Sequence, residues 1–214
     1  MRRFALALLV ALSSPLLTGA GQPVPPRHLD LGSDDRAELD AISASLNAVT
    51  TLKGGFVQVD PNGGVDQGRV YISKPGKMRF EYDPPVPSLI VSDGRTVAVA
   101  NRRLNTVDRY PLSDTPLAVI LGNDIDIRHN PQLVGVEHGQ GVFVVNMRTS
   151  QNRTRANISL VFSEPDHELR QWTVIDDQGL STTVALRDLQ PGAVLPPALF
   201  VLPDKNTFVP RRMN

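Results

Sequence analysis

The chain has 214 residues with 22 basic and 22 acidic side chains, so its formal net charge is zero. This length is enough for one large domain with a substantial core, and the balanced charge argues against nucleic-acid binding, which normally shows a basic excess. The sequence contains no cysteine, which excludes disulfides, thiolate metal sites, thiol catalysis and a lipid anchor on a cysteine of this chain.

The N-terminus predicts an export signal. Arg2 and Arg3 precede an apolar run over residues 4–12, and residues 18–20 are small enough for a cleavage site. The run is shorter than the roughly 20 apolar residues of a membrane span, so we expect residues 1–20 to be removed and the mature protein not to span a membrane. The arginine pair leaves both the general secretory route and the twin-arginine route open, and we favour the first.

A proline-rich flexible leader is expected over residues 21–34, before a single domain over residues 35–214. Asp35 followed by Glu38 fits a helical capping box. Apolar residues then recur at spacings of three and four, which predicts one apolar face of a first helix. This face is formed by Leu39, Ile42, Leu46 and Val49. The threonine and glycine pairs over residues 50–55 are expected to end the helix.

From Phe56 onward the sequence alternates as antiparallel strands do, with Gly, Pro and Asp turns between the runs. The dipeptide Asp93–Gly94 gives the clearest hairpin signal. The expected strands cover residues 56–59, 69–73, 78–82, 88–92, 96–100, 105–110, 133–138, 142–147, 157–162, 169–175 and 182–189. Many short strands with few helices predict one curved antiparallel sheet or barrel.

A second, short helix is expected between Thr115 and Gly122. Thr115 suits the N-cap, Pro116 suits the first helical position, and Gly122 suits the residue after the end. The residues between them are almost all apolar, so this helix must cover an apolar surface.

No convincing metal-binding or catalytic pattern is present. His28, His129, His138 and His167 stand apart from one another and are expected to be solvated. The acidic stretch over residues 164–168 contains proline and predicts an exposed turn.

Asp124 and Asp126 alternate, which predicts two carboxylates on one strand face. Paired carboxylates can hydrolyse glycosides, but two acids alone are a weak pattern, so a glycan hydrolase is only a distant hypothesis. We expect no enzyme, no cofactor and no metal site.

One stretch, Gly68–Pro85 with the sequence GRVYISKPGKMRFEYDPP, resembles the signature of the outer-membrane lipoprotein carrier family, LolA. Companion motifs occur in the family's order: Gly55–Gln58, Ile90–Gly94, Tyr110–Leu112, Thr115–Leu117 and Phe200–Pro203. Each motif alone is weak, whereas the ordered set is specific. The resemblance extends over residues 36–209.

The resemblance implies a mainly β fold, a half-open antiparallel β-barrel of about eleven strands with an α-helical lid over an unfilled hydrophobic cavity. It also implies a monomeric periplasmic chaperone that binds the acyl chains of lipoproteins. Such a chaperone receives its cargo from an inner-membrane lipoprotein-releasing ABC transporter and delivers it to an outer-membrane lipoprotein receptor, where one is present.

The resemblance, together with strand alternation, also suggests residue roles. The cavity lining is assigned to Phe56, Val70, Ile72, Met78, Phe80 and Tyr82, and the lid to Ile42, Leu46, Val49, Leu117, Ile120 and Leu121. Lys74 stands where the family often has an arginine that would hold the lid shut through lid backbone, although lysine offers fewer and less rigid donors. The alternatives are ordinary core packing for the apolar residues and a solvated turn for Lys74.

A second hypothesis is a regulatory sensor resembling RseB, whose lipid-binding-like domain has this architecture. Such sensors carry an additional C-terminal domain, and this chain ends soon after Phe208, which favours the carrier. The outer-membrane receptor LolB shares the fold but is anchored through a lipidated cysteine.

Overall fold

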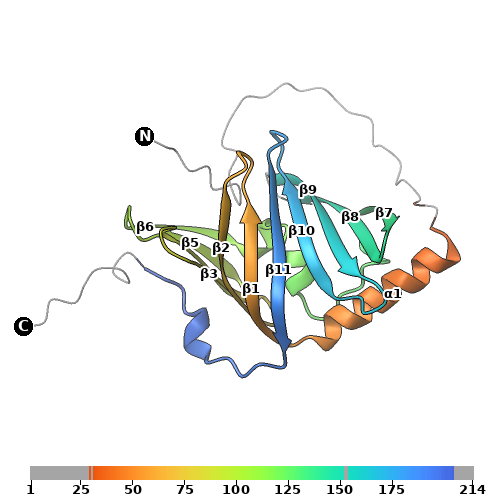
Figure 1. Ribbon diagram of the computed structural model, residues 1–214, viewed down its shortest axis with the longest axis horizontal. Helices are drawn as coiled ribbons and strands as arrows, with labels where there is room; N and C mark the ends of the chain where they lie inside the picture. The colour runs from red at the N-terminus through yellow and green to blue at the C-terminus, as the bar shows by residue number, and fades with distance from the viewer. Residues whose placement is uncertain (1–28, 30, 152–153, 205–214) are drawn as a thin grey trace, which may run out of the picture.

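A single antiparallel sheet of eleven strands dominates the computed structural model, which describes residues 29, 31–151 and 154–204 (Figure 1). The strands are β1 (Thr51–Val59), β2 (Val65–Ser73), β3 (Lys77–Tyr82), β4 (Ser88–Asp93), β5 (Thr96–Asn101), β6 (Thr106–Pro111), β7 (Leu133–Gly139), β8 (Val142–Gln151), β9 (Thr154–Ser163), β10 (Leu169–Ile175) and β11 (Ser181–Pro191). The expected signal segment, residues 1–20, and most of the expected leader lie outside the described residues.

The order across the sheet is β6-β5-β4-β3-β2-β1-β11-β10-β9-β8-β7. Nearly every strand pairs with its neighbour in the chain, and the long-range pairing of β1 with β11 joins the two halves. Because β6 and β7 are the two edges and do not pair, the curved sheet stays open. The predicted half-open barrel of eleven strands is therefore confirmed.

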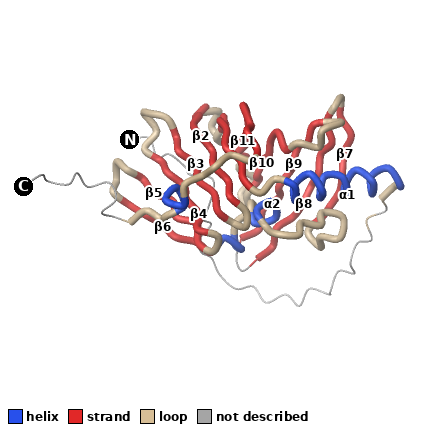
Figure 2. The backbone as a smooth tube through the Cα atoms, turned by 90° about the horizontal axis from the view of Figure 1, so that it is seen from below, coloured by secondary structure: helices blue, strands red, loops and turns tan. Residues whose placement is uncertain are grey.

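Three helical elements pack on the concave side of this sheet: α1 (Ser33–Ala48), the 3₁₀ turn η1 (Leu112–Asp114) and α2 (Ala118–Leu121). A fourth, the 3₁₀ turn η2 (Pro197–Phe200), follows β11. Figure 2 shows α1 beside the β7–β9 half, with the short α2 between it and the strands of the other half. α1 begins before the predicted Asp35, because Gly32 is the N-cap and the Asp35 carboxylate accepts the Gly32 N–H at 3.1 Å. Asp35 thus takes the third helical position of the cap and not the first.

The second helix is shorter than predicted. Thr115 does not cap α2, because its hydroxyl and its N–H both donate to the carbonyl of Leu112 and close the preceding 3₁₀ turn. α2 therefore begins after Leu117, whereas Gly122 follows its last residue as predicted.

β1 starts earlier than predicted and includes Gly54 and Gly55, which were expected to end the first helix. The glycines serve strand pairing instead. A Cβ atom on Gly54 would lie 2.9 Å from the carbonyl oxygen of Arg187 in β11. Glycine therefore allows the two halves of the sheet to approach closely where their register shifts.

The concave face of the sheet carries the main core. Alternate residues of β3 are buried, namely Met78, Phe80 and Tyr82, which confirms that they share one strand face. Phe56 packs edge-to-face on Phe80 and on Tyr82, with ring centroids 5.1 Å and 5.0 Å apart. Gly68 leaves room for the Phe56 ring, because a Cβ atom there would lie 2.8 Å from it.

The chain after β11 crosses the opposite, convex face of the sheet, where η2 contacts β3 and β4 (Figure 1). Arg79 donates to the carbonyl of Leu199 at 3.3 Å, and Arg109 donates to that of Pro203 at 2.8 Å. The concave face is covered instead by α1, η1, α2 and the connection to β7, all of which contribute to the main core cluster.

Candidate functional site

An apolar pocket of about 80 Å³ lies between the last turn of α1, α2 and the sheet. Its lining is mostly aliphatic, which suits an apolar ligand. The lining residues are Ser45, Leu46, Val49, Leu52, Ile72, Lys74, Ile120, Leu121, Glu168, Leu169, Leu186, Leu189 and Pro191.

The pocket is much smaller than the expected hollow. Ordinary small-molecule sites have volumes of roughly 300–1,000 Å³, and 80 Å³ holds a few methylene groups and not a whole acyl chain. Other residues expected to line the hollow are buried in the core, among them Phe56 and Met78, which are 0% and 1% exposed. A long acyl chain therefore does not fit in this pocket as it stands.

The predicted site residues divide into two groups. One group lines the pocket: Leu46, Val49, Ile72, Lys74, Ile120 and Leu121. The other is buried in the surrounding core: Ile42, Phe56, Val70, Met78, Phe80, Tyr82 and Leu117. Contact with a ligand stays a prediction for both groups, and the second group would meet one only after the interior opens.

Lys74 links the sheet to α1. Its ammonium group donates to the carbonyl oxygen of Leu46 at 2.7 Å. Leu46 lies in the last turn of the helix, where carbonyl groups lack an intrahelical partner. Burial lowers the pKa of Lys74 to about 8, because an apolar surrounding disfavours the charged form.

The β2–β3 turn, residues 74–76, also holds α2. The N–H of Gly76 donates to the carbonyl of Leu121, the last residue of α2, at 2.8 Å. The hydroxyl of Ser92 in turn donates to the carbonyl of Gly76 at 2.7 Å. One short turn thus binds the C-terminal ends of both helices.

Only glycine fits at position 76. Its φ of +71° is disfavoured for other residues, and a Cβ atom there would lie 2.7 Å from the Cα of Gly94. The sequence predicted a turn here but missed the roles of Gly76 and Ser92, because nothing local indicates that β4 supports the β2–β3 turn.

The pocket residues contributed by β10 and β11 were also missed. Leu169 and Leu186 lie in segments predicted as strands, and alternation could have placed them on an inner face. That this face meets α1 depends on the pairing of β1 with β11, which no local pattern reveals.

Two histidines tie the N-terminal half of α1 to the sheet. Nε2 of His138 lies 2.8 Å from the Asp35 carboxylate, and Nε2 of His167 lies 2.6 Å from that of Glu38. The hydrogen bond with Asp35 raises the pKa of His138 and lowers that of Asp35. His138 is exposed on β7, as expected, whereas His167 is half-buried in the β9–β10 turn, and the carboxylate partners of both were not predicted.

The paired-carboxylate hypothesis also needs correction. Asp124 and Asp126 lie in the connection between α2 and β7 and not on a strand. Asp126 accepts hydrogen bonds from the backbone N–H of His129 and from its Nδ1, at 3.1 Å and 2.7 Å, and these bonds lower the pKa of Asp126. Asp124 has a φ of +52°, as in a turn. The two carboxylates therefore have unrelated local roles.

Within residues 29, 31–151 and 154–204, no helix has the length and apolar character needed to cross a membrane. The same described part of the chain contains no cluster of three or more His, Asp or Glu side chains suited to a metal ion.

A family model described as "Outer membrane lipoprotein carrier protein LolA" matches residues 47–203. The outer-membrane lipoprotein carrier protein of Chromobacterium violaceum is 28% identical over 166 residues, which cover 74% of this chain and 80% of that protein. The protein of the same description from Nitrosomonas europaea is 29% identical over 170 residues, covering 75% and 82%.

Solved structures show a more distant likeness. A LolA superfamily protein from Nitrosomonas europaea has a TM-score of 0.42 and 11% identity, over 76% of this chain and 96% of that chain. MucB in complex with MucA(peri) has a TM-score of 0.39 and 14% identity, over 79% and 60%.

Proposed function

Because the chain belongs to the LolA family of outer membrane lipoprotein carrier proteins, we propose that it is a periplasmic chaperone for lipoproteins. It binds the acyl chains of its cargo in the pocket between α1, α2 and the sheet. It accepts them from an inner-membrane ABC transporter and releases them at an outer-membrane receptor. It acts as a monomer and catalyses no reaction.

The observation that carries this proposal is an apolar pocket that two helices cover. The lining is aliphatic, and the two helices over it are held at their ends by the β2–β3 turn. The eleven strands are hydrogen-bonded in a row from the edge strand β6 to the opposite edge strand β7, and neither helix is part of this row. The helices can therefore move apart from the sheet while the sheet remains intact.

The energetics of the cargo require such a closure. Each acyl methylene group in water costs about 0.8 kcal/mol, so a lipoprotein needs an apolar enclosure to cross an aqueous compartment. Release requires that the closed state be only modestly favoured. Lys74 suits this requirement, because its hydrogen bond to Leu46 is partly offset by the desolvation that lowers its pKa.

Native mass spectrometry tests the proposal. The full chain is exported to the periplasm of a bacterial host, purified, and examined for bound acylated lipopeptide or lipoprotein. We compare Val49→Asp, in the pocket lining, with Val194→Asp, which makes the same change at a side chain that is 97% exposed. The wild type and Val194→Asp should retain acylated cargo, and Val49→Asp should lose most of it.

Folded wild-type protein without any bound acyl species would contradict the proposal. A transfer assay adds a second criterion, because a carrier must pass its cargo to outer-membrane vesicles. Retention of lipid without transfer would instead favour a sensing domain of the RseB kind.

A further inference from the structure

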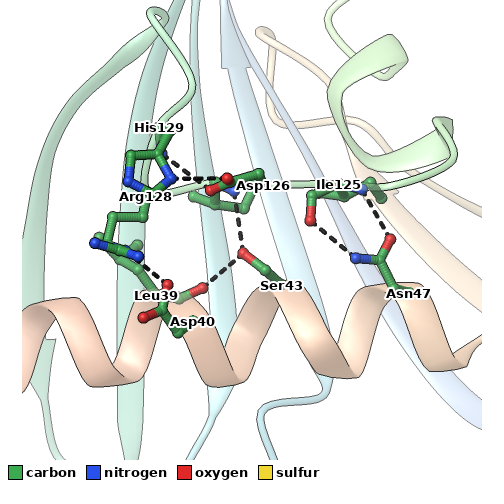
Figure 3. Close-up of polar contacts among 9 residues, drawn as sticks. Leu39, Asp40, Ser43, Asn47, Ile125, Asp126, Arg128 and His129 are labelled. Atoms are coloured by element: carbon green, nitrogen blue, oxygen red, sulfur yellow. Dashed lines mark hydrogen bonds and ion pairs between the residues drawn. The ribbon is translucent and has the colours of Figure 1, made fainter.

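The connection between α2 and β7 runs alongside α1 in an extended conformation (Figure 3). Asn47 makes the first contact. Its carboxamide accepts the N–H of Ile125 at 2.8 Å and donates to the carbonyl of the same residue at 2.9 Å. A side-chain amide carries one acceptor and two donors, so Asn47 pairs with Ile125 much as a neighbouring strand would.

Ser43 repeats this contact one helical turn earlier. Its hydroxyl accepts the N–H of Ile127 at 3.0 Å and donates to the carbonyl of Leu39 at 2.7 Å. Four helical residues advance about 6 Å and two extended residues about 6.6 Å. Helix and segment therefore stay in register, and Asp40 with Arg128 continues the row at 2.7 Å.

The other side of the same segment faces the core. Ile125 and Ile127 are 8% and 0% exposed and belong to the main hydrophobic cluster. Neither residue lies in a strand, and the carbonyl of Ile127 accepts the N–H of Asn130. The other three backbone groups, both of Ile125 and the N–H of Ile127, find their partners in the side chains of α1. If α1 moved alone, these groups would lose their partners, which is costly for buried backbone.

We infer that Asn47 and Ser43 are positioning residues that join α1 and residues 125–128 into a single moving body. The inference rests on the proposed function only in that cargo binding would drive the motion of the helices. The coupling itself is a property of the cargo-free protein. α2 ends at Leu121, directly before this segment. The hydrogen bonds from Lys74 to α1 and from Gly76 to α2 are therefore broken together, and the two helices move away from the sheet as one rigid unit.

Amide hydrogen exchange followed by NMR tests the coupling on the cargo-free chain. In Asn47→Ala the amide of Ile125 loses its own acceptor, so its faster exchange is not informative. The informative amide is that of Ile127, because its acceptor, Ser43, is unchanged. If the segment and the helix form one body, the Ile127 amide should exchange roughly tenfold faster or more in this variant.

Asn101→Ala is the matched control. The Asn101 side chain also makes two bonds to backbone, accepting the N–H groups of Arg103 and Leu104 at 3.0 Å each, in the distant β5–β6 turn. It should leave exchange at Ile127 unchanged. An Ile127 amide that exchanges at the wild-type rate in Asn47→Ala would overturn the inference, because the two contacts would then be independent tethers.

A second measurement uses a synthetic tripalmitoylated cysteinyl peptide. When it is added to the wild type, protection at Leu46 in α1 and at Ile127 should change by the same factor, and in Asn47→Ala the two factors should diverge. A change at Leu46 without any change at Ile127 in the wild type would also overturn the inference. Failure of the peptide to bind at all would count against the proposed function, while the cargo-free exchange would still decide the coupling.

Discussion

Replacing Leu186 in β11 with phenylalanine should stabilise the protein and impair cargo retention. Leu186 lines the pocket and is 9% exposed, so the added ring would extend into the 80 Å³ of empty space. The ring adds about 25 Å³, and unfilled cavity costs about 24 cal/mol per Å³. Filling it should therefore raise the free energy of unfolding by about 0.6 kcal/mol, or the melting temperature by about 1–2 °C.

The same ring occupies space that the first acyl methylenes would enter, so the amount of co-purified cargo should fall severalfold. Urea denaturation measures the stability change, and native mass spectrometry of protein from the periplasm measures cargo. Leu186→Met serves as control, because it nearly conserves volume and should change neither quantity much.

Two outcomes would refute this reasoning. If Leu186→Phe is more stable but retains cargo as well as the wild type, the acyl chains do not use this pocket. If the variant is destabilised by more than about 1 kcal/mol, the ring is overpacked and the space beside Leu186 cannot admit a ligand without a larger rearrangement.

Three further predictions concern the contacts that hold the helices. The pKa of Lys74 is lowered to about 8 from 10.5, so the free energy of unfolding should rise with pH between these values, where the unfolded chain binds more protons. In urea denaturation Lys74→Met should lack that rise, and a pH profile equal to that of the wild type would contradict the burial of the ammonium group. Because the pKa of His138 is raised beside Asp35, this pair stabilises the fold below about pH 6.5 and loses its contribution as pH rises through the folded-state pKa. From pH 6 to pH 8 the urea midpoint of His138→Gln should therefore fall less than that of the wild type, and an equal fall would show that the pair does not stabilise the fold. Gly76→Ala combines a positive φ with a backbone clash, whereas Gly63→Ala has a positive φ in open space. The loss in free energy of unfolding should therefore be larger for Gly76→Ala by at least about 1 kcal/mol, and equal losses in the two variants would show that the β2–β3 turn adapts.

Local patterns predicted most of the fold. The strand segments were recognised because side chains alternate between two faces with a period of two, as in Met78, Phe80 and Tyr82. The errors lie at helix ends and glycines. Thr115 has the chemistry of an N-cap but closes a 3₁₀ turn, and Gly54 suggested a break but allows two strands to approach. In each case the local signal permitted two structures, and for Gly54 the contact with β11 selected one.

The candidate site was predictable only in part. Lys74 and the apolar residues of both helices were named from motifs, and the structure places Lys74 within hydrogen-bonding distance of the α1 backbone. How far the interior closes was not predictable, because it depends on how the side chains of opposite strands pack together. Where the hollow was expected, the described residues enclose an apolar pocket of about 80 Å³.

The sequence by itself determined most of the strands, the family and the apolar character of both helices, since these depend on residue spacings of two to four and on ordered motifs. Only the tertiary structure decided which elements meet. The joining of β1 to β11 and the pairing of Asn47 with Ile125, 78 residues away, bring distant segments together. Such contacts form only when packing of the whole core repays the entropy of closing long loops, and no local stretch of sequence encodes that balance.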